Sequence, residues 1–141
     1  VIRFGYRWGR KGITMSYKVE RLSDVPAILT TVYKDFEINN ELEQMNRDTL
    51  AILDPSEVPL FLITDFQLAL GIDDLFQSAS TLRRENSIWK HPNIRQVIVI
   101  TPDPLLRLAA QGMKSPILGG FNIKLFDSVP EARAYVRSQS K

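Results

Sequence analysis

The sequence predicts a single α/β domain in which helices pack on a mixed, mostly parallel β-sheet. Two short apolar runs, Leu60–Ile63 and Val97–Ile100, are typical of strands that are covered on both faces. Segments of helical periodicity separate these runs, and a pair of strand-like segments precedes them. At 141 residues the chain is long enough to bury one core without disulfides or metals. The predicted element order is β-β-α-β-α-β-α-β-α.

The first two strands are expected to form an antiparallel hairpin. Residues Tyr17–Leu22 alternate in character, and Ser23–Pro26 supplies a turn. Ala27–Tyr33 follows and is rich in the β-branched residues that strands favour. The turn between the two segments predicts their direct pairing.

A helix is predicted between about Phe36 and Leu53, where the apolar spacing changes. Its buried face should consist of four residues at helical spacing: Ile38, Leu42, Met45 and Ile52. Four charged residues should lie largely outside this face: Glu41, Glu43, Arg47 and Asp48. The dipeptide Asp54-Pro55 should end the helix, because the residue before a proline disfavours helical geometry.

Three further helices are predicted in the second half of the chain. The first has an apolar face made of Ile72, Leu75, Phe76, Ala79 and Leu82. The second begins at Thr101-Pro102-Asp103-Pro104, which combines a capping residue with a first-turn proline. Its expected apolar face is Leu105, Leu106, Leu108 and Ala109.

A short strand, Asn122–Phe126, precedes the last helix. Ser128 and Glu131 have the spacing of a capping box, in which each side chain binds a free backbone N–H of the first turn. The expected apolar side of this helix is Val129, Ala132, Tyr135 and Val136.

Basic residues are concentrated at the N-terminus. Residues 1–14 contain four basic residues and no acid, whereas the rest of the chain contains 14 basic and 16 acidic residues. A basic segment with interleaved aromatic residues is typical of contacts with nucleic acid or an anionic membrane. The alternative is that Met15 is the natural start and that residues 1–14 are a disordered head or translated upstream sequence. We favour this alternative, with a domain at residues 15–141 and no nucleic-acid partner.

The composition argues against several classes of protein. The absence of cysteine rules out disulfides and thiol chemistry and disfavours a zinc site. No apolar run reaches the roughly 18–20 residues that span a bilayer. Residues 1–14 lack the apolar region of a secretory signal. We therefore expect a cytoplasmic protein with no cofactor, no bound metal and no transmembrane segment.

Polar residues gather where two predicted strands end. Asp65 follows the strand Leu60–Ile63, and Asp73 and Asp74 open the next helix, while Thr101 and Asp103 follow the neighbouring strand. Open α/β sheets usually keep their working surface at the carboxyl ends of the strands. These five residues are therefore candidate partner-binding residues. The alternative for Asp73 and Asp74 is structural, because the helix dipole favours acidic residues in the first turn.

Two segments resemble motifs of the anti-sigma-factor-antagonist (STAS) domain family. The family hallmark reads approximately D-L-S-x-V-x-x-I-D-S-S-G, and residues 65–76 read D-F-Q-L-A-L-G-I-D-D-L-F. Both aspartates, the step between them and Ile72 are retained. Residues 126–132, F-D-S-V-P-E-A, are similar to the final strand, turn and capped helix of the family. The resemblance covers residues 16–139 and implies a STAS-like fold.

The chain departs from the hallmark at the phosphorylation switch. Phosphorylation-controlled members carry a serine after the second aspartate, where this chain has Asp74, and Leu75 and Phe76 replace the small residue and glycine that follow. The resemblance is nearest to the stand-alone, Sec14-related branch of the family. It implies a non-enzymatic regulatory or protein-interaction module that lacks the usual phosphoacceptor and binds a protein partner or a second copy of itself.

The alternative function is binding of a small apolar ligand or lipid. The loop at residues 112–120 has an apolar centre between glycines, and a pocket beneath it would be lined by Trp89, Met113, Ile117 and Leu118. An enzyme using the carboxylates for acid–base chemistry is less favoured. No motif places a nucleophile beside His91, which is the single histidine of the chain.

Overall fold

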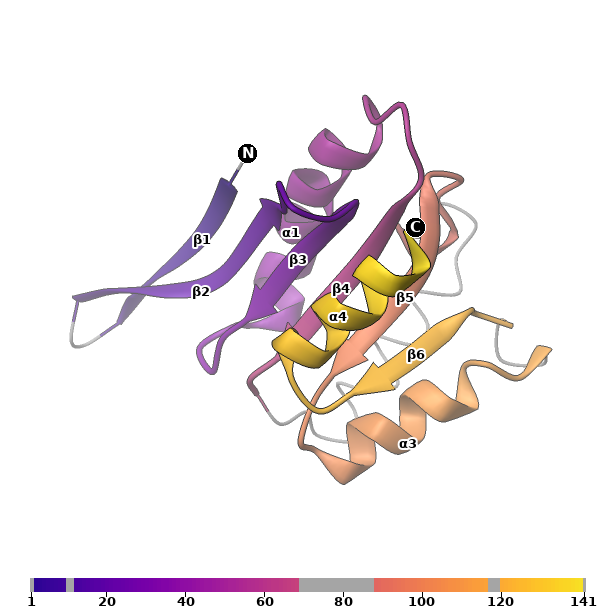
Figure 1. Cartoon of the computed structure of the whole chain (residues 1–141). Coiled ribbons are helices and arrows are strands. Elements are labelled where there is room, and N and C mark those ends of the chain that lie inside the picture. Colours follow the sequence, from indigo (N-terminus) through magenta and orange to yellow (C-terminus); the bar gives the residue numbers. More distant parts are fainter. Residues whose placement is uncertain (1, 10–11, 69–87, 117–119, 141) are drawn as a thin grey trace.

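The computed structural model describes residues 2–9, 12–68, 88–116 and 120–140 of the chain. Its centre is a six-stranded sheet with the strand order β1-β2-β3-β4-β5-β6 (Figure 1). The strands are β1 Ile2–Gly9, β2 Gly12–Arg21, β3 Ala27–Val32, β4 Leu60–Phe66, β5 Ile94–Ile100 and β6 Ile123–Phe126. The helices are α1 Ile38–Leu53, α3 Pro104–Gly112, α4 Val129–Gln139 and the short 3-10 helix η1 Ile88–Lys90.

The sheet is mixed and mostly parallel. Strands β1, β2 and β3 pair antiparallel, whereas β3, β4, β5 and β6 pair parallel in that order. The hairpin predicted from the sequence is β2–β3, in which Tyr17 lies in register with Val32. The predicted α/β class and mostly parallel sheet are confirmed, and β1 adds a strand that the sequence did not predict.

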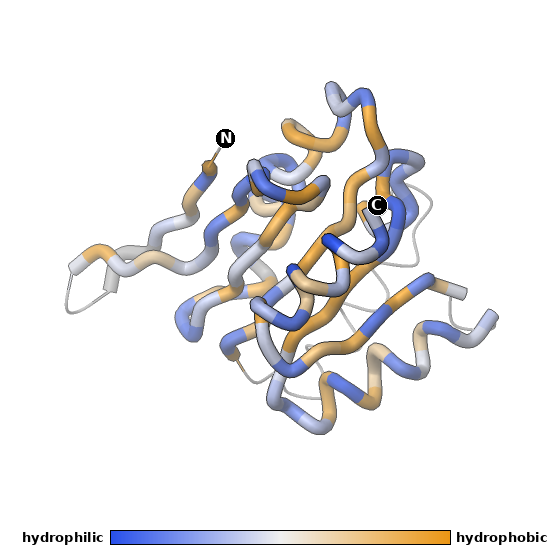
Figure 2. The backbone as a smooth tube through the Cα atoms, in the orientation of Figure 1, coloured by the Kyte–Doolittle hydropathy of each residue, from blue (hydrophilic) through white to orange (hydrophobic). Residues whose placement is uncertain are grey.

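The apolar run of β4 is explained by burial on both faces of the sheet. Leu60 and Leu62 join a core cluster with residues of α1, whereas Phe61 and Ile63 join a cluster with residues of α4. Val97 of β5 lies in register with Leu62 and packs with α3, so α1 and α3 cover the same face. Helix α4 covers the other face (Figure 1). Hydrophobic residues are accordingly concentrated along β4 and β5 (Figure 2).

Helix α1 has the predicted apolar face, with one exception among its charged residues. Met45 and Ile52 are buried, and Ile38 and Leu42 pack against the same core cluster. Asp48 was expected outside this face but is only 8% exposed. Its burial is tolerated because two side chains donate hydrogen bonds to its carboxylate, as described below.

The predicted apolar face of α3 is partly wrong. Leu106 and Ala110 are buried, but Leu105 is exposed and Leu108 is 70% exposed. The helix begins at Pro104 after the cap residue Asp103, and the spacing Leu106–Ala110–Met113 turns toward the sheet. Leu105 and Leu108 lie off this stripe and meet solvent.

The last helix begins as the sequence predicted. The Ser128 side chain is the N-cap of α4 and accepts a hydrogen bond from the backbone N–H of Glu131 at 3.3 Å. Ala132 and Val136 are buried, and Val129 and Tyr135 pack against the same cluster. The helix predicted around Ile72–Leu82 lies outside the described residues.

Strand β1 corrects the expectation of a disordered head. Residues Ile2–Gly9 form a strand that pairs with β2, and β2 itself begins at Gly12, before Met15. The sequence did not suggest this strand because its arginines and glycines obscure the alternation of Ile2, Phe4 and Tyr6. The position of the natural start stays a prediction.

Candidate functional site

The predicted partner-binding residues meet, in part, at the carboxyl edge of the parallel strands. Asp65 lies near the end of β4 in register with Ile100 of β5, so Thr101 begins the loop beside it. The Asp65 carboxylate accepts a hydrogen bond from Gln67 at 3.3 Å. Asp73 and Asp74 lie outside the described residues, so their place relative to this edge stays a prediction.

Thr101 and Asp103 are bound within the fold. Thr101 is 1% exposed, and its hydroxyl oxygen accepts a hydrogen bond from the backbone N–H of Asp103 at 3.1 Å. The Asp103 carboxylate in turn accepts the N–H of Leu105 at 3.1 Å and caps α3. These contacts account for both residue types at the start of a helix, and the partner-binding role assigned to them stays a prediction.

An ion pair at the same edge was not predicted from the sequence. The Arg107 guanidinium donates hydrogen bonds to the backbone oxygen of Thr101 and to the Asp127 carboxylate, both at 3.0 Å. It therefore ties α3 to the ends of β5 and β6. No spacing in the sequence reveals this contact, because Asp127 lies on another element, 20 positions along the chain.

Two residues of the predicted apolar-ligand pocket belong to the core. The Trp89 ring packs edge-on against Phe121 with centroids 5.6 Å apart, and Met113 is buried in the same cluster. The backbone N–H of Phe121 also bonds to the oxygen of Met113 at 3.0 Å, which holds the ends of the loop together. Ile117 and Leu118 lie outside the described residues, so the ligand site as a whole stays a prediction.

His91 joins two connections at the amino ends of the strands. Its Nδ1 accepts the backbone N–H of Asn93 at 3.0 Å, so in the neutral ring Nε2 carries the proton. Nε2 lies 2.8 Å from the Asp54 carboxylate, to which it donates. This pair fastens the end of α1 to the connection before β5.

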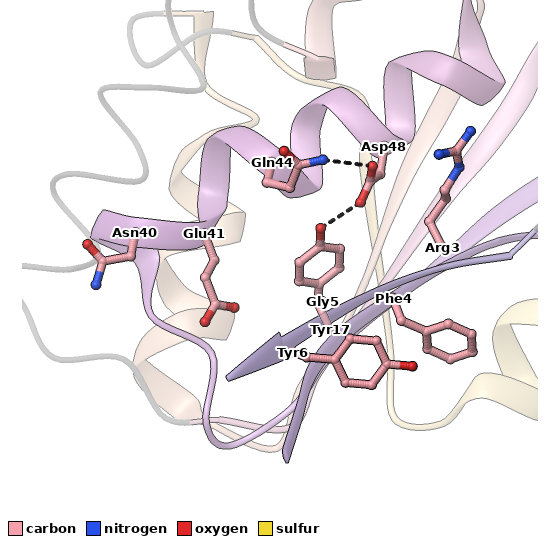
Figure 3. Close-up of a pocket in the computed structure, with 9 residues that line it drawn as sticks. All are labelled: Arg3, Phe4, Gly5, Tyr6, Tyr17, Asn40, Glu41, Gln44 and Asp48. Atoms are coloured by element: carbon pink, nitrogen blue, oxygen red, sulfur yellow. Dashed lines mark hydrogen bonds between the residues drawn. The ribbon is translucent and has the colours of Figure 1, made fainter. Parts of the chain in front are cut away.

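A hollow opens between the β1–β2 hairpin and α1 (Figure 3). Its volume is about 510 Å³. The residues that line it are Arg3, Phe4, Gly5, Tyr6, Tyr17, Asn40, Glu41, Gln44 and Asp48. The lining therefore combines aromatic rings with two carboxylates and one guanidinium.

The buried carboxylate of Asp48 is held by two hydrogen bonds in the hollow. The Tyr17 hydroxyl donates to one of its oxygens at 2.5 Å, and the Gln44 amide donates to the other at 3.0 Å (Figure 3). Burial raises the pKa of Tyr17, and the hydrogen bond to Asp48 and its negative charge raise that pKa further. The hydroxyl therefore keeps its proton well into the alkaline range.

Gly5 allows β1 to lie directly on Tyr17. The two residues are in register, and a Cβ atom added at Gly5 would lie 1.9 Å from the Tyr17 ring. The Tyr17 ring also packs edge-on against the Phe36 ring, with the two ring centroids 6.1 Å apart. The hairpin is therefore joined to α1 through one aromatic side chain that only glycine accommodates.

The outer edge of β1 carries a row of exposed apolar side chains. Ile2, Phe4 and Tyr6 are 53%, 41% and 61% exposed, and we name this row, with the outer backbone of β1, the hairpin edge. Phe4 lies in register with Lys18, whose ammonium is 5.9 Å from the Phe4 ring centroid and 2.9 Å from Glu20. Helix α4 packs on β4, β5 and β6. The same face of β1 and β2 is not covered by any described helix (Figure 1).

Within residues 2–9, 12–68, 88–116 and 120–140, no three His, Asp or Glu side chains cluster to hold a metal ion. The helices described in those ranges are all too short or too polar to cross a membrane.

Comparison with known proteins gives one similarity, at the level of structure. No protein-family model and no curated protein sequence matches the chain. A similar crystal structure, at 2.25 Å resolution, is that of an uncharacterised protein from the DUF3478 family with a SpoIIAA-like fold, from Shewanella loihica PV-4. The two chains share 13% identity, the match covers 96% of this chain and 93% of that chain, and the TM-score is 0.48. This similarity concerns fold alone and does not extend to the Sec14-related branch of the STAS family.

Proposed function

We propose that the protein is a non-enzymatic regulatory module that acts by protein–protein contact through the hairpin edge. The observation that carries the proposal is the exposure of Ile2, Phe4 and Tyr6 in one row on the last strand of the sheet. The regulatory role, and membership of the STAS family and its Sec14-related branch, form part of the proposal and rest on the sequence resemblance at residues 65–76 and 126–132.

An edge strand of this kind favours association. Its outward N–H and C=O groups are a ready template for another strand, and soluble proteins usually protect such edges with charges, prolines or bulges on the exposed side. Here the row Ile2, Phe4 and Tyr6 is apolar and faces solvent, although the exposed Arg3 alternates with it, and the irregularity between Gly5 and Tyr6 lies in the pairing with β2. Strand addition gives affinity through the backbone and specificity through alternate side chains. The hairpin edge supplies both.

Affinity capture with matched variants tests this function. The full chain is immobilised, and proteins retained from an extract of the source organism are identified and then purified for direct binding. Phe4→Lys and Tyr6→Lys should abolish the interaction because each places a charge in the apolar row. Leu108→Lys is the control, since it changes an apolar residue on α3 that is even more exposed than Phe4 and Tyr6. Binding that persists in both hairpin variants, or the absence of any partner and any self-association, would contradict the proposal.

The surface around Asp65, Thr101 and Asp103 is a second candidate for the same function. Asp65 is half-buried and held by Gln67, while Thr101 and Asp103 are engaged in capping α3. If Asp65→Asn lost a partner that Phe4→Lys and Tyr6→Lys still bound, the contact surface would be the carboxyl edge around Asp65 and not the hairpin edge. The apolar-ligand function stays a prediction, because Ile117 and Leu118 lie outside the described residues, whereas Trp89 and Met113 pack into the core.

A further inference from the structure

We propose that one face of the β1–β2 hairpin docks on an anionic lipid surface. This face, which we name the hairpin face, consists of Ile2, Phe4 and Tyr6 of β1 together with Ile13 of β2, all of them exposed. The inference goes beyond the proposed function. A partner strand pairs with the outer backbone of β1 in the plane of the sheet, whereas a membrane covers one face of it, so the two contacts are compatible in geometry.

The strand register places the four side chains together. Alternate residues of a strand lie on the same face, so Ile2, Phe4 and Tyr6 share one face, and the Phe4 and Tyr6 ring centroids are 6.0 Å apart. Ile13 pairs with position 8 of β1, which has the same parity. The irregularity of this pairing adds a residue to β2 and not to β1, so the alternation along β1 is unbroken. The hairpin face is therefore fixed before it meets a membrane, and docking costs little conformational entropy.

Charge is divided unequally between the hairpin and the rest of the chain. Residues 1–20 contain five basic residues and one acid, whereas residues 21–141 contain 13 basic and 15 acidic residues. The acid among residues 1–20 is Glu20, which lies 2.9 Å from the Lys18 ammonium. The N-terminal segment is thus cationic on a mildly acidic body. An anionic membrane attracts a cationic segment that lies within about a Debye length, roughly 8–10 Å, of its surface.

The side chains of the hairpin face favour lipid over nucleic acid as the anionic partner. Aromatic rings suit both, because they stack on bases and also lie at the headgroup level of a membrane. Ile2 and Ile13 have no ring to stack on a base and no polar group to bond one. In a membrane such aliphatic side chains enter the boundary between headgroups and acyl chains, where their burial is favourable. Exposed aliphatic and aromatic side chains on a cationic segment are therefore explained together by a lipid surface.

The ion pair beside the apolar row also favours a lipid surface over a dry protein interface. Lys18 lies in register with Phe4, and its ammonium is 5.9 Å from the Phe4 ring centroid. An apolar protein surface laid on the row would take the Lys18–Glu20 pair out of water, which costs free energy. Lipid headgroups are polar and hydrated, so the pair stays solvated there. Two copies of the hairpin would in addition repel each other, because each carries the same net positive charge.

Vesicle binding by the full chain tests the inference. We expect the protein to sediment with vesicles of equimolar phosphatidylglycerol and phosphatidylcholine, to bind vesicles of phosphatidylcholine alone much more weakly, and to be released as salt rises. Phe4→Glu and Ile13→Glu should each weaken binding to the anionic vesicles at least about tenfold, equivalent to about 1.4 kcal/mol, because each replaces an apolar contact with a repelled charge. Leu108→Glu makes the same change at an exposed position on α3 and should leave binding nearly unchanged.

The absence of cysteine in the chain permits a second measurement that does not depend on loss of binding. An environment-sensitive fluorophore is attached to the Tyr6→Cys variant and, as the control, to the Leu108→Cys variant. Anionic vesicles should shift the emission of the label at position 6 to shorter wavelength and leave that of the label at position 108 unchanged. Circular dichroism of every variant checks that it is folded.

The outcomes separate this inference from the proposed function. An absence of binding to anionic vesicles overturns the inference, as does binding that both glutamate variants leave intact or a label at position 6 that does not shift. Binding of single-stranded DNA without binding of vesicles overturns it in favour of nucleic acid. A chain that binds vesicles through the hairpin face but captures no protein supports the inference and contradicts the proposed function. A chain that captures a protein through the hairpin edge and binds no vesicles does the reverse.

Discussion

Tyr17 shows how one side chain can join the N-terminal hairpin to the rest of the fold. Its ring lies between Gly5 and Phe36, and its hydroxyl reaches the carboxylate of Asp48 on α1. Asp48 is buried, and its charge is tolerated because Tyr17 and Gln44 each donate to one oxygen. Removal of either donor should therefore affect stability more than the loss of an exposed hydrogen bond.

Replacing Tyr17 with phenylalanine tests this role. We expect the free energy of unfolding at neutral pH to fall by about 1.5–3 kcal/mol, because a charged acceptor loses a donor. Urea unfolding of the wild type, Tyr17→Phe and the exposed-site control Tyr6→Phe measures the difference. A change in Tyr17→Phe no larger than that in Tyr6→Phe would show that the contact with Asp48 contributes little.

The raised pKa of Tyr17 also predicts a pH dependence. The native state holds the phenolic proton more tightly than the unfolded chain, in which tyrosine ionises near pH 10.0. Stability from this group is therefore complete below about pH 10 and is lost progressively as the pH rises above it. The stability difference between wild type and Tyr17→Phe should shrink in that range. If the stability difference between wild type and Tyr17→Phe instead grew above pH 10, it would contradict a raised pKa of Tyr17 in the folded protein.

Thr30 offers the opposite kind of prediction. It is buried in β3, and its hydroxyl has no hydrogen-bond partner among the residues that the structure describes. Valine has the same branched shape and no polar atom, so Thr30→Val should raise the free energy of unfolding by about 1 kcal/mol. Thermal and urea unfolding measure the change. Thr49→Val is the matched control, because the buried Thr49 hydroxyl donates to the backbone oxygen of Met45 at 2.9 Å and its loss should not stabilise.

Among the elements, those with one dominant pattern were predicted correctly. The runs in β4 and β5 are unbroken because both faces of these strands are buried, and the start of α4 is marked by its capping box. Strand β1 was not predicted, and the face of α3 was predicted partly wrongly, because both patterns depend on tertiary neighbours. The apolar residues of β1 lie on its exposed side. Its inward side carries Gly5, where any larger residue would clash with the Tyr17 ring.

Strand β1 should be sensitive to a single methyl group. In Gly5→Ala the new Cβ would clash with the Tyr17 ring, so either the ring leaves its contact with Asp48 or β1 separates from β2. We expect a loss of about 1–3 kcal/mol in unfolding free energy and faster amide hydrogen exchange confined to residues 2–9 and 12–20. Tyr6→Ala is the control, because Tyr6 is exposed. Equal exchange in both variants would argue against the close packing at Gly5.

Asp103 allows its structural and partner-binding roles to be separated. Asn is as good an N-cap as Asp, whereas Ala is not, so Asp103→Ala should destabilise the protein by about 1 kcal/mol and Asp103→Asn by much less. If the carboxylate also contacts a partner, both variants should weaken binding, since both remove the charge. Urea unfolding and a binding assay on the two variants give the comparison. If Asp103→Ala and Asp103→Asn both bind the partner as the wild type does, the role of Asp103 is limited to capping α3.

On the scale of the whole molecule, the helices cover the sheet unequally. Helices α1 and α3 lie on one face and α4 lies on the other, so the hairpin β1–β2 extends past the helix on that side (Figure 1). The sequence predicted the class of fold, and it predicted that Asp65 and Thr101 lie at the ends of neighbouring strands, β4 and β5. It did not predict the hollow or the hairpin edge. Both arise where segments distant in sequence come together, and neither leaves a local periodicity.

A chain that begins at Met15 tests whether the body folds without the hairpin edge. The core cluster beneath α4 contains no residue of β1, and neither does the cluster around Val97 and Ile123, so both should form unchanged. The shortened chain exposes one side of the Tyr17 ring, and burial of apolar surface is worth about 25 cal/mol per Å². We therefore expect cooperative unfolding with a loss of about 1–3 kcal/mol, measured by urea titration against the full chain. Complete unfolding would mean that β1 is part of the folding unit.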